Sequence, residues 1–208
     1  MKISNSAVAL TAVALSATIG SLAHAQGVTQ DLEFYGAAAF GDHLVEKPLA
    51  GRAIQLDDEA KFGTRYTISA HERFGLQLAA GAAPSKINYT QGGDVDVDVY
   101  TVDANLLVNL TPQLQLGSHK LETYAVIGAG YAWADADDPI VGVIGSTPTT
   151  LDDDGGFTAN AGLGAKLFVT DAIYVGLDAR YRYIDTLLKH NGKELNTVET
   201  ALSIGFRF

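Results

Sequence analysis

Cysteine is absent from the sequence, and proline and positive charge are scarce. The lack of cysteine excludes disulfide frameworks, zinc–thiolate sites and thiol nucleophiles. Only five prolines are present, which excludes collagen-like and proline-rich linker classes. Lys and Arg number 14 against 24 Asp and Glu, giving a net charge of -10. Such a chain has no general attraction for phosphate backbones, so we expect no nucleic-acid partner.

The composition is that of a folded protein, and the first residues have the pattern of an export signal. Of the 208 residues, 47% are apolar and 18% charged, which favours one folded domain. Lys2, the apolar run 7–19 and the small-x-small site Ala23-His24-Ala25 are the three parts of a secretory signal. The run is shorter than the roughly 20 residues of a spanning helix. We therefore expect residues 1–25 to be a cleaved signal peptide and residues 26–208 to form one domain.

The predicted mature chain alternates apolar and polar residues in short segments separated by turns. Eight strands are expected, at 31–41, 60–71, 75–88, 96–110, 121–134, 157–169, 173–185 and 196–208. Long connections at 42–59, 89–95, 135–156 and 186–195 alternate with tight turns at 72–74 and 170–172 and a medium connection at 111–120. Valines 95, 97 and 99 have the opposite parity to Val102, which predicts a bulge near Val99 and Tyr100. Both faces of 121–134 are apolar or small, so its inner face cannot be assigned.

Alternation leaves open whether the apolar face lies inside, as in a soluble ligand-binding calyx, or outside. Three features favour the outside. The opposite face combines glycines with charged residues, which suits the narrow interior of an eight-stranded barrel. Aromatic residues gather near the strand ends, as in membrane-spanning barrels. The chain is also predicted to be exported. The expected fold is all-β, an eight-stranded antiparallel up-and-down transmembrane β-barrel, closed between strands 196–208 and 31–41.

The C-terminal strand places apolar residues at alternating positions up to the last residue. These are Leu202, Ile204, Phe206 and Phe208. The pattern resembles the outer-membrane assembly signal of Gram-negative bacterial barrels. The segments KFGTRYTISAHERFGLQLAAG (61–81), YAVIGAGYAW (124–133) and DARYRYID (178–185) resemble the small eight-stranded outer-membrane protein superfamily, which includes the OmpA transmembrane domain, OmpX, opacity proteins and OmpW. The resemblance covers most of residues 31–208.

This resemblance implies a location in the bacterial outer membrane, with both termini in the periplasm and the four long connections outside. It also implies outer-membrane lipid, lipopolysaccharide and the barrel-assembly machinery as partners. Neither a cofactor nor an external ligand is indicated by these motifs.

On the predicted strands, the face opposite the apolar side chains carries ten charged residues, six positive and four negative. They are Glu33, Lys61, Arg65, Asp103, Lys166, Asp178, Arg180, Arg182, Glu199 and Arg207. One interpretation is a hydrogen-bonded plug of ion pairs, because unpaired charges there would be costly. The other is a narrow pore whose charges select ions. We favour the plug because an eight-stranded interior is nearly filled by side chains. Asp178, Arg180, Arg182 and Glu199 are expected to form its central network.

Aspartates gather at the two ends of the connection 135–156, at positions 135, 137, 138, 152, 153 and 154. Carboxylates suit Ca²⁺, but we favour a solvated external loop as the explanation. Asp94-x-Asp96-x-Asp98 resembles the start of a calcium loop, yet its sixth position is Val99 instead of Gly. We therefore expect no metal site.

A catalytic role has weak support in the sequence. Some eight-stranded outer-membrane barrels modify lipid A with a His and a Ser, and such a Ser needs a base within hydrogen-bond reach. His43 and His190 stand in long connections, and no His-x-Ser occurs near the C-terminal strands. The sequence thus predicts a structural or surface-interaction barrel without catalytic residues. A small pore or carrier and a lipid-modifying enzyme are the alternatives.

Overall fold

The computed structural model describes residues 28–41, 59–89, 93–136, 141–144, 147–150, 155–185 and 195–208. The strands are β1 (Thr29–Gly41), β2 (Glu59–His71), β3 (Phe74–Tyr89), β4 (Gly93–Leu116), β5 (His119–Ala136), β6 (Val141–Ile144), β7 (Thr147–Thr150), β8 (Gly155–Phe168), β9 (Ile173–Ile184) and β10 (Leu195–Arg207). The described residues include no helix long and apolar enough to cross a membrane. The predicted signal peptide lies outside the described residues.

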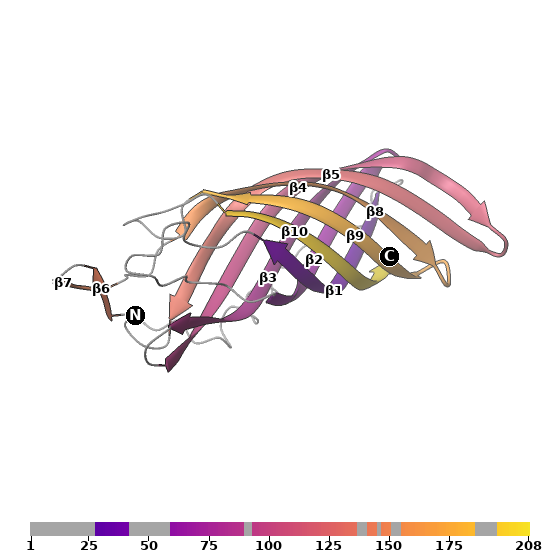
Figure 1. The fold of residues 1–208 in the computed structure, drawn as a ribbon. Coiled ribbons are helices and arrows are strands. Elements are labelled where there is room, and N and C mark those ends of the chain that lie inside the picture. The colour runs from indigo at the N-terminus through magenta and orange to yellow at the C-terminus, as the bar shows by residue number, and fades with distance from the viewer. Residues whose placement is uncertain are drawn as a thin grey trace.

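Eight of the strands close into a barrel, as Figure 1 shows. The order around the wall is β1-β10-β9-β8-β5-β4-β3-β2, and every neighbouring pair is antiparallel. The first and last strands pair from Asp31↔Arg207 to Gly41↔Thr197. Closure gives the edge strands hydrogen-bond partners, which a sheet in lipid requires. The predicted eight-stranded up-and-down barrel is confirmed.

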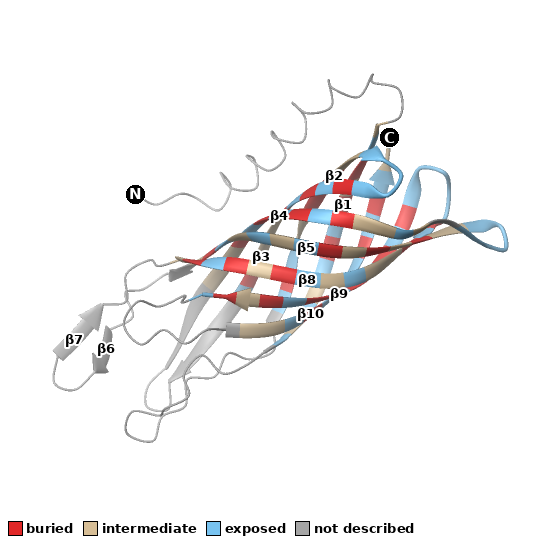
Figure 2. Ribbon diagram, turned by 90° about the horizontal axis from the view of Figure 1, so that it is seen from above, coloured by how far each residue is buried: buried red, intermediate tan, exposed pale blue. Residues whose placement is uncertain are grey.

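The apolar face of each strand points outward. In β9, exposed and buried residues alternate along almost the whole strand, as the period of two requires. Leu177 is 61% exposed, whereas Arg180 is 2% exposed. Figure 2 shows the same alternation of buried and exposed positions along the wall. The calyx alternative, with the leucines inside, is therefore wrong.

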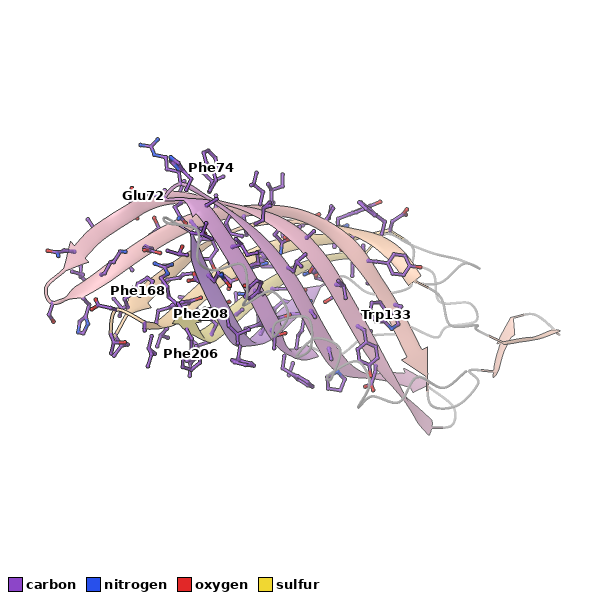
Figure 3. All side chains as sticks on the ribbon, turned by 180° about the vertical axis from the view of Figure 1, so that it is seen from behind. Glu72, Phe74, Trp133, Phe168, Phe206 and Phe208 are labelled. Atoms are coloured by element: carbon purple, nitrogen blue, oxygen red, sulfur yellow. The ribbon has the colours of Figure 1, made fainter. Side chains whose placement is uncertain are left out.

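Exposed aromatic residues lie toward both ends of this apolar surface. Phe40, Tyr131, Phe157 and Tyr181 are exposed toward the end with the long connections. Phe74, Phe206 and Phe208 are exposed toward the opposite end, which we call the short-turn end. In Figure 3 these three phenylalanines lie far from Trp133 along the barrel. Two aromatic girdles around a band of Leu, Val and Ala are typical of a barrel surrounded by lipid.

Several details of the structure differ from the sequence prediction. The long connection predicted at 89–95 is wrong, because β3 and β4 stay paired as far as Tyr89↔Gly93. The medium connection 111–120 is instead a continuation of β4 and β5, with a tight turn at Gly117, whose φ is 64°. The β3–β4 register runs without a shift through Val99 and Tyr100, so the bulge predicted there is wrong. The β4–β5 register shifts twice between Asn109 and Leu114. Within the predicted loop 135–156, β6 and β7 form a short hairpin.

The misplaced bulge has a physical reason. Pairing of β2 with β3 ends at Phe62↔Ala82, and Ala82 pairs with Tyr100 of β4. Before Tyr100, β4 therefore runs beyond the closed part of the barrel, where lipid and lumen no longer fix which face is apolar. The opposite parity of valines 95, 97 and 99 therefore reflects this change of surroundings. It does not require the extra residue that a bulge would insert.

Candidate functional site in the barrel interior

The interior of the barrel holds the charged residues of all the inward faces. Nine of the ten predicted residues are buried, and the tenth, Arg207, has a side chain 20% exposed. Two buried carboxylates that the sequence analysis missed, Asp31 and Glu122, join them. The described interior therefore contains six cations and six anions. They form three groups of four, which we call the upper, middle and lower quartets, running from the long connections to the short-turn end.

The upper quartet consists of Lys61, Asp103, Arg182 and Glu199. Arg182 donates from both Nη atoms to the two oxygens of Asp103, at 2.8 and 2.9 Å, and from Nε to Glu199 Oε1 at 2.8 Å. Lys61 Nζ lies 3.1 Å from the same Glu199 oxygen. Thr158 also donates to Asp103 Oδ1, at 3.0 Å. Two cations and two anions from β2, β4, β9 and β10 thus neutralise one another across the lumen.

The middle quartet consists of Glu33, Arg65, Asp178 and Arg180. Arg65 Nη1 lies 2.6 Å from Glu33 Oε1 and 2.6 Å from Asp178 Oδ2. Arg180 Nε donates to Asp178 Oδ1 at 2.7 Å. Both Asp178 oxygens are therefore engaged by guanidinium groups. Charge-assisted bonds of this length are the strong class of hydrogen bond, and again the group is neutral.

The lower quartet consists of Asp31, Glu122, Lys166 and Arg207. Arg207 Nε lies 2.7 Å from Asp31 Oδ1, and its Nη1 lies 2.8 Å from Glu122 Oε1. Lys166 Nζ lies 2.7 Å from Asp31 Oδ2. Lys120, whose side chain is 37% exposed, adds a contact of 2.8 Å to Glu122 at the short-turn end. This quartet joins β1, β5, β8 and β10.

Tyrosine rings fill space among the quartets. The Arg65 guanidinium lies 4.1 Å from the centre of the Tyr35 ring, and Lys166 Nζ lies 4.7 Å from the centre of the Tyr174 ring. Tyr174 also donates to Glu33 Oε2 at 3.2 Å. A Cβ atom at Gly205 would overlap the Tyr174 ring. The interior glycine thus makes room for a large side chain that packs among the charges.

Uncharged polar side chains form a second interior feature along the wall. Asn160 donates to Asn105 at 3.0 Å, Asn105 donates to Gln77 at 3.2 Å, and Gln77 donates to Thr67 at 3.2 Å. Arg180 Nη2 also donates to Gln77 Oε1, at 3.3 Å, which links this chain to the middle quartet. The wall and the ion pairs therefore belong to one connected polar interior.

The expected central network divides differently in the structure. Asp178 and Arg180 belong to the middle quartet, whereas Arg182 and Glu199 belong to the upper one. The expectation that these four residues form one group is wrong. Adjacent strands bring their backbones together, but each carboxylate also reaches a cation of β2, which is not adjacent to either strand: Asp178 contacts Arg65 and Glu199 contacts Lys61.

The two missed carboxylates each carried a parity signal. Asp31 stands two residues before Glu33 on the same strand, and Glu122 stands two residues before Tyr124. Residues i and i+2 share a face, so Asp31 should point inward with Glu33, and Glu122 should share the face of Tyr124. The β5 signal was masked by apolar residues that also point inward, because Leu107, Tyr124 and Val126 form a buried cluster in the interior.

The described residues contain no group of three or more His, Cys, Asp or Glu side chains that could hold a metal ion. Most of the aspartates of connection 135–156 lie outside the described residues, as do His43 and His190. His71 and His119 are exposed near turns at the short-turn end.

Comparisons with known proteins agree with this architecture. The family model of the outer membrane protein beta-barrel domain matches residues 6–208. The crystal structure of OprG from Pseudomonas aeruginosa has 13% identity and a TM-score of 0.53, covering 88% of this chain and 96% of that one. The solid-state NMR structure of AlkL in lipid bilayers has 16% identity and a TM-score of 0.50, covering 86% of this chain and 90% of that one. A comparison with curated proteins finds no match.

Identities this low show the shared fold alone. The family match covers nearly the whole chain, so the predicted resemblance and the predicted outer-membrane location are both confirmed.

Proposed function

This chain belongs to the outer membrane protein beta-barrel domain family, and from that premise we propose that it is a structural and surface-interaction protein with a lumen closed to ions. Its termini face the periplasm, and the connections at the opposite end, which join β1 to β2, β3 to β4, β5 to β8 and β9 to β10, face the outside. In this role the barrel is a rigid anchor in the membrane, and the connections are the parts that meet external partners.

The observation that carries the proposal is the neutral, hydrogen-bonded interior. The three quartets each combine two cations with two anions, and together they engage seven strands, from β1, β2, β4 and β5 to β8, β9 and β10. An ion crossing the lumen would have to break buried pairs, and leaving one buried charge without its partner costs about 3–5 kcal/mol. Paired charges also offer a passing ion no excess of either sign. Both arguments favour a plug.

A pore for ions or small solutes is the alternative, and conductance across a planar bilayer decides between the two. We expect the purified wild-type protein to insert without steady current steps. A paired variant, Arg182→Ala with Glu199→Ala, removes one cation and one anion from the upper quartet, so the quartet stays neutral while its volume falls. We expect rare, small current steps from this variant at most.

A matched control keeps the interior intact. Asp171→Asn lies in the exposed turn between β8 and β9 and should behave as the wild type does. Regular current steps from the wild type, with a reversal potential that shifts in a salt gradient, would reject the plug and support the pore. Each preparation is first checked for the shift in gel mobility on heating that marks a folded barrel.

A further inference from the structure

The hairpin formed by the ends of β4 and β5 extends beyond the wall that surrounds it. Val108 is the last β4 residue paired with β3, and Asn109 N then donates to Arg73 O at 2.8 Å. Beyond this point, no strand of the described chain pairs with β4 on its β3 side. Pairing of β5 with β8 ends at Lys120↔Phe168. Figure 1 shows this hairpin reaching farther past the C-terminus than the other turns at that end.

The two faces of the hairpin differ in polarity. Leu114 pairs with Leu121 on the outer face, which continues the lipid-facing surface of Leu106 and Leu110 on the same strand. Leu110, Leu114 and Leu116 are all exposed. On the other face Gln115 pairs with Lys120, and both line an open polar pocket together with Arg207. His119, the cross-strand partner of Leu116, is exposed next to the turn, and its Nδ1 lies 3.2 Å from Phe168 O. Apart from this residue, the hairpin has an apolar face of leucines and a polar face.

Simple geometry places its leucines past the edge of the apolar band. The eight steps from Val108 to Leu116, less two taken up by the register shifts, leave about six regular steps of ~3.3 Å. At a tilt of about 40°, these steps span roughly 15 Å along the barrel axis. The neighbouring β2–β3 turn exposes Glu72 and Arg73, which must lie outside the hydrocarbon. The headgroup layer adds only about 5–8 Å on each side, so a straight hairpin would carry Leu116 into water.

The hairpin has a bend at its root. The two register shifts lie between Asn109 and Leu114, and bulges bend and twist the strand that carries them. Figure 1 shows β4 and β5 curving along this stretch. A bend at the level of the headgroups lets an amphipathic hairpin lie along the membrane surface with one face in lipid.

We propose that residues 109–123 form a membrane-interface anchor that lies in the headgroup–acyl boundary of the leaflet at the short-turn end. Its partner is the phospholipid surface itself: Leu110, Leu114, Leu116 and Leu121 enter the lipid, while Gln115 and Lys120 face water. The continuity of these leucines with the lipid-facing band favours lipid over protein. Strand addition by a second chain is disfavoured, because Pro112 has no N–H to donate and the register shifts interrupt the edge. The proposal does not depend on whether the lumen conducts.

The test uses tryptophan fluorescence, because Trp133 is the only tryptophan in the chain. In a Trp133→Phe background, Leu114→Trp and Leu116→Trp report on the outer face, and Gln115→Trp is the matched control on the inner face. Leu106→Trp is the reference within the band. The full chain is reconstituted in phosphatidylethanolamine and phosphatidylglycerol vesicles that carry bromine at a shallow or a deep acyl position.

We expect Leu114→Trp and Leu116→Trp to emit at shorter wavelengths than Gln115→Trp and to be quenched at least twofold more strongly by shallow bromine. Leu106→Trp should respond more to deep bromine. The proposal would be overturned if Leu114→Trp emitted at the wavelength of a tryptophan in water and acrylamide quenched it as strongly as Gln115→Trp. Protection from both bromine and acrylamide, together with cross-linked dimers, would also overturn it, because a second copy would then cover the face.

A second measurement keeps the proposal testable if a tryptophan variant fails to fold. The chain has no cysteine, so Leu114→Cys and Gln115→Cys can each carry a single nitroxide label. Oxygen concentrates in lipid, whereas a water-soluble nickel chelate stays outside it. The spin-relaxation rate of the label at 114 should therefore rise more with oxygen than with the chelate, and the order should reverse at 115. Equal accessibility to the nickel chelate at both positions would reject the anchor.

Discussion

Arg182 of β9 and Asp103 of β4 face each other across the barrel interior through two parallel hydrogen bonds of 2.8 and 2.9 Å. Two other strands, β8 and β5, lie between them in the wall. Arg182 also donates to Glu199 of β10 at 2.8 Å. One guanidinium thus connects three strands through the lumen, in addition to the hydrogen bonds of the wall.

The first prediction concerns this connection. Arg182→Met should lower the free energy of unfolding by about 3–5 kcal/mol, because it leaves Asp103 buried without its charged partner. Urea titration in vesicles, followed by the gel-mobility difference between folded and unfolded barrel, measures the change. Lys120→Met removes a partly exposed cation and should cost less than about 1 kcal/mol. Equal losses in the two variants would mean that the interior pairs do not stabilise the barrel.

The second prediction contrasts two neighbours on the inner face of β10. Gly205→Ala should destabilise the barrel by about 1–3 kcal/mol, because the new methyl group overlaps the Tyr174 ring. Ser203→Ala should change stability by less than about 1 kcal/mol, since the buried Ser203 Oγ has no hydrogen-bond partner among the described residues. The same urea titration compares them. Comparable effects, or a stabilising Gly205→Ala, would show that the Tyr174 ring has room to move.

The sequence alone was sufficient for the eight strands of the barrel and for the outward apolar face, because both depend on a period of two that lipid enforces. Leu177 and Arg180 are examples, one exposed and one buried. The ion-pair partners could not be predicted. Parity says that a side chain points into the lumen, but not which of the facing strands it reaches, as Asp178 and Glu199 show.

Prediction was weakest where the closed wall ends. We expected a medium connection at 111–120, but β4 and β5 extend through it as strands. The prediction failed because, outside the closed wall, the apolar pattern no longer marks where a strand ends. Glu122 was missed for a related reason: inward-pointing Val126 and Tyr124 made β5 apolar on both faces. An interior that is locally apolar removes the contrast on which face assignment depends.

The third prediction tests the outward apolar face in a membrane. Leu177→Cys and Leu202→Cys, in a chain without other cysteines, should resist a membrane-impermeant maleimide in vesicles and react fully in urea. Asp171→Cys, in the exposed β8–β9 turn, should react under both conditions when the turn faces the outer solution. Rapid labelling at Leu177→Cys in intact vesicles would contradict burial of that surface in lipid.

The fourth prediction concerns export. Cleavage after Ala25 should leave a mature protein that begins at Gln26, and N-terminal sequencing of the membrane-inserted protein checks this. Ala25→Arg replaces the small residue before the predicted cleavage site and should leave the precursor uncut. Lys2→Arg keeps the positive start and should be processed normally. A native protein that retains residues 1–25 would reject the assignment of a cleaved signal.

The fifth prediction separates assembly from stability at the C-terminal residue. Phe208 is 59% exposed, while its backbone N–H donates to Gln30 O at 2.9 Å and its main-chain oxygen accepts from Gln30 N at 3.0 Å. Phe208→Ala keeps both backbone bonds, so the free energy of unfolding of refolded protein should change by less than about 1 kcal/mol. In cells, the amount of folded barrel in the outer membrane should nevertheless fall, because the side chain belongs to the predicted assembly signal.

Phe74→Ala is the matched control. Phe74 is also an exposed phenylalanine (51%) toward the short-turn end, but it belongs to β3 and not to the C-terminal strand. The amount of each variant is measured by membrane fractionation and heat-dependent gel mobility. A fall for Phe208→Ala alone would assign its effect to recognition during assembly, because lipid contact is lost in both variants. Equal falls would instead assign the effect to the aromatic girdle, and Phe208 would then have no separate role in assembly.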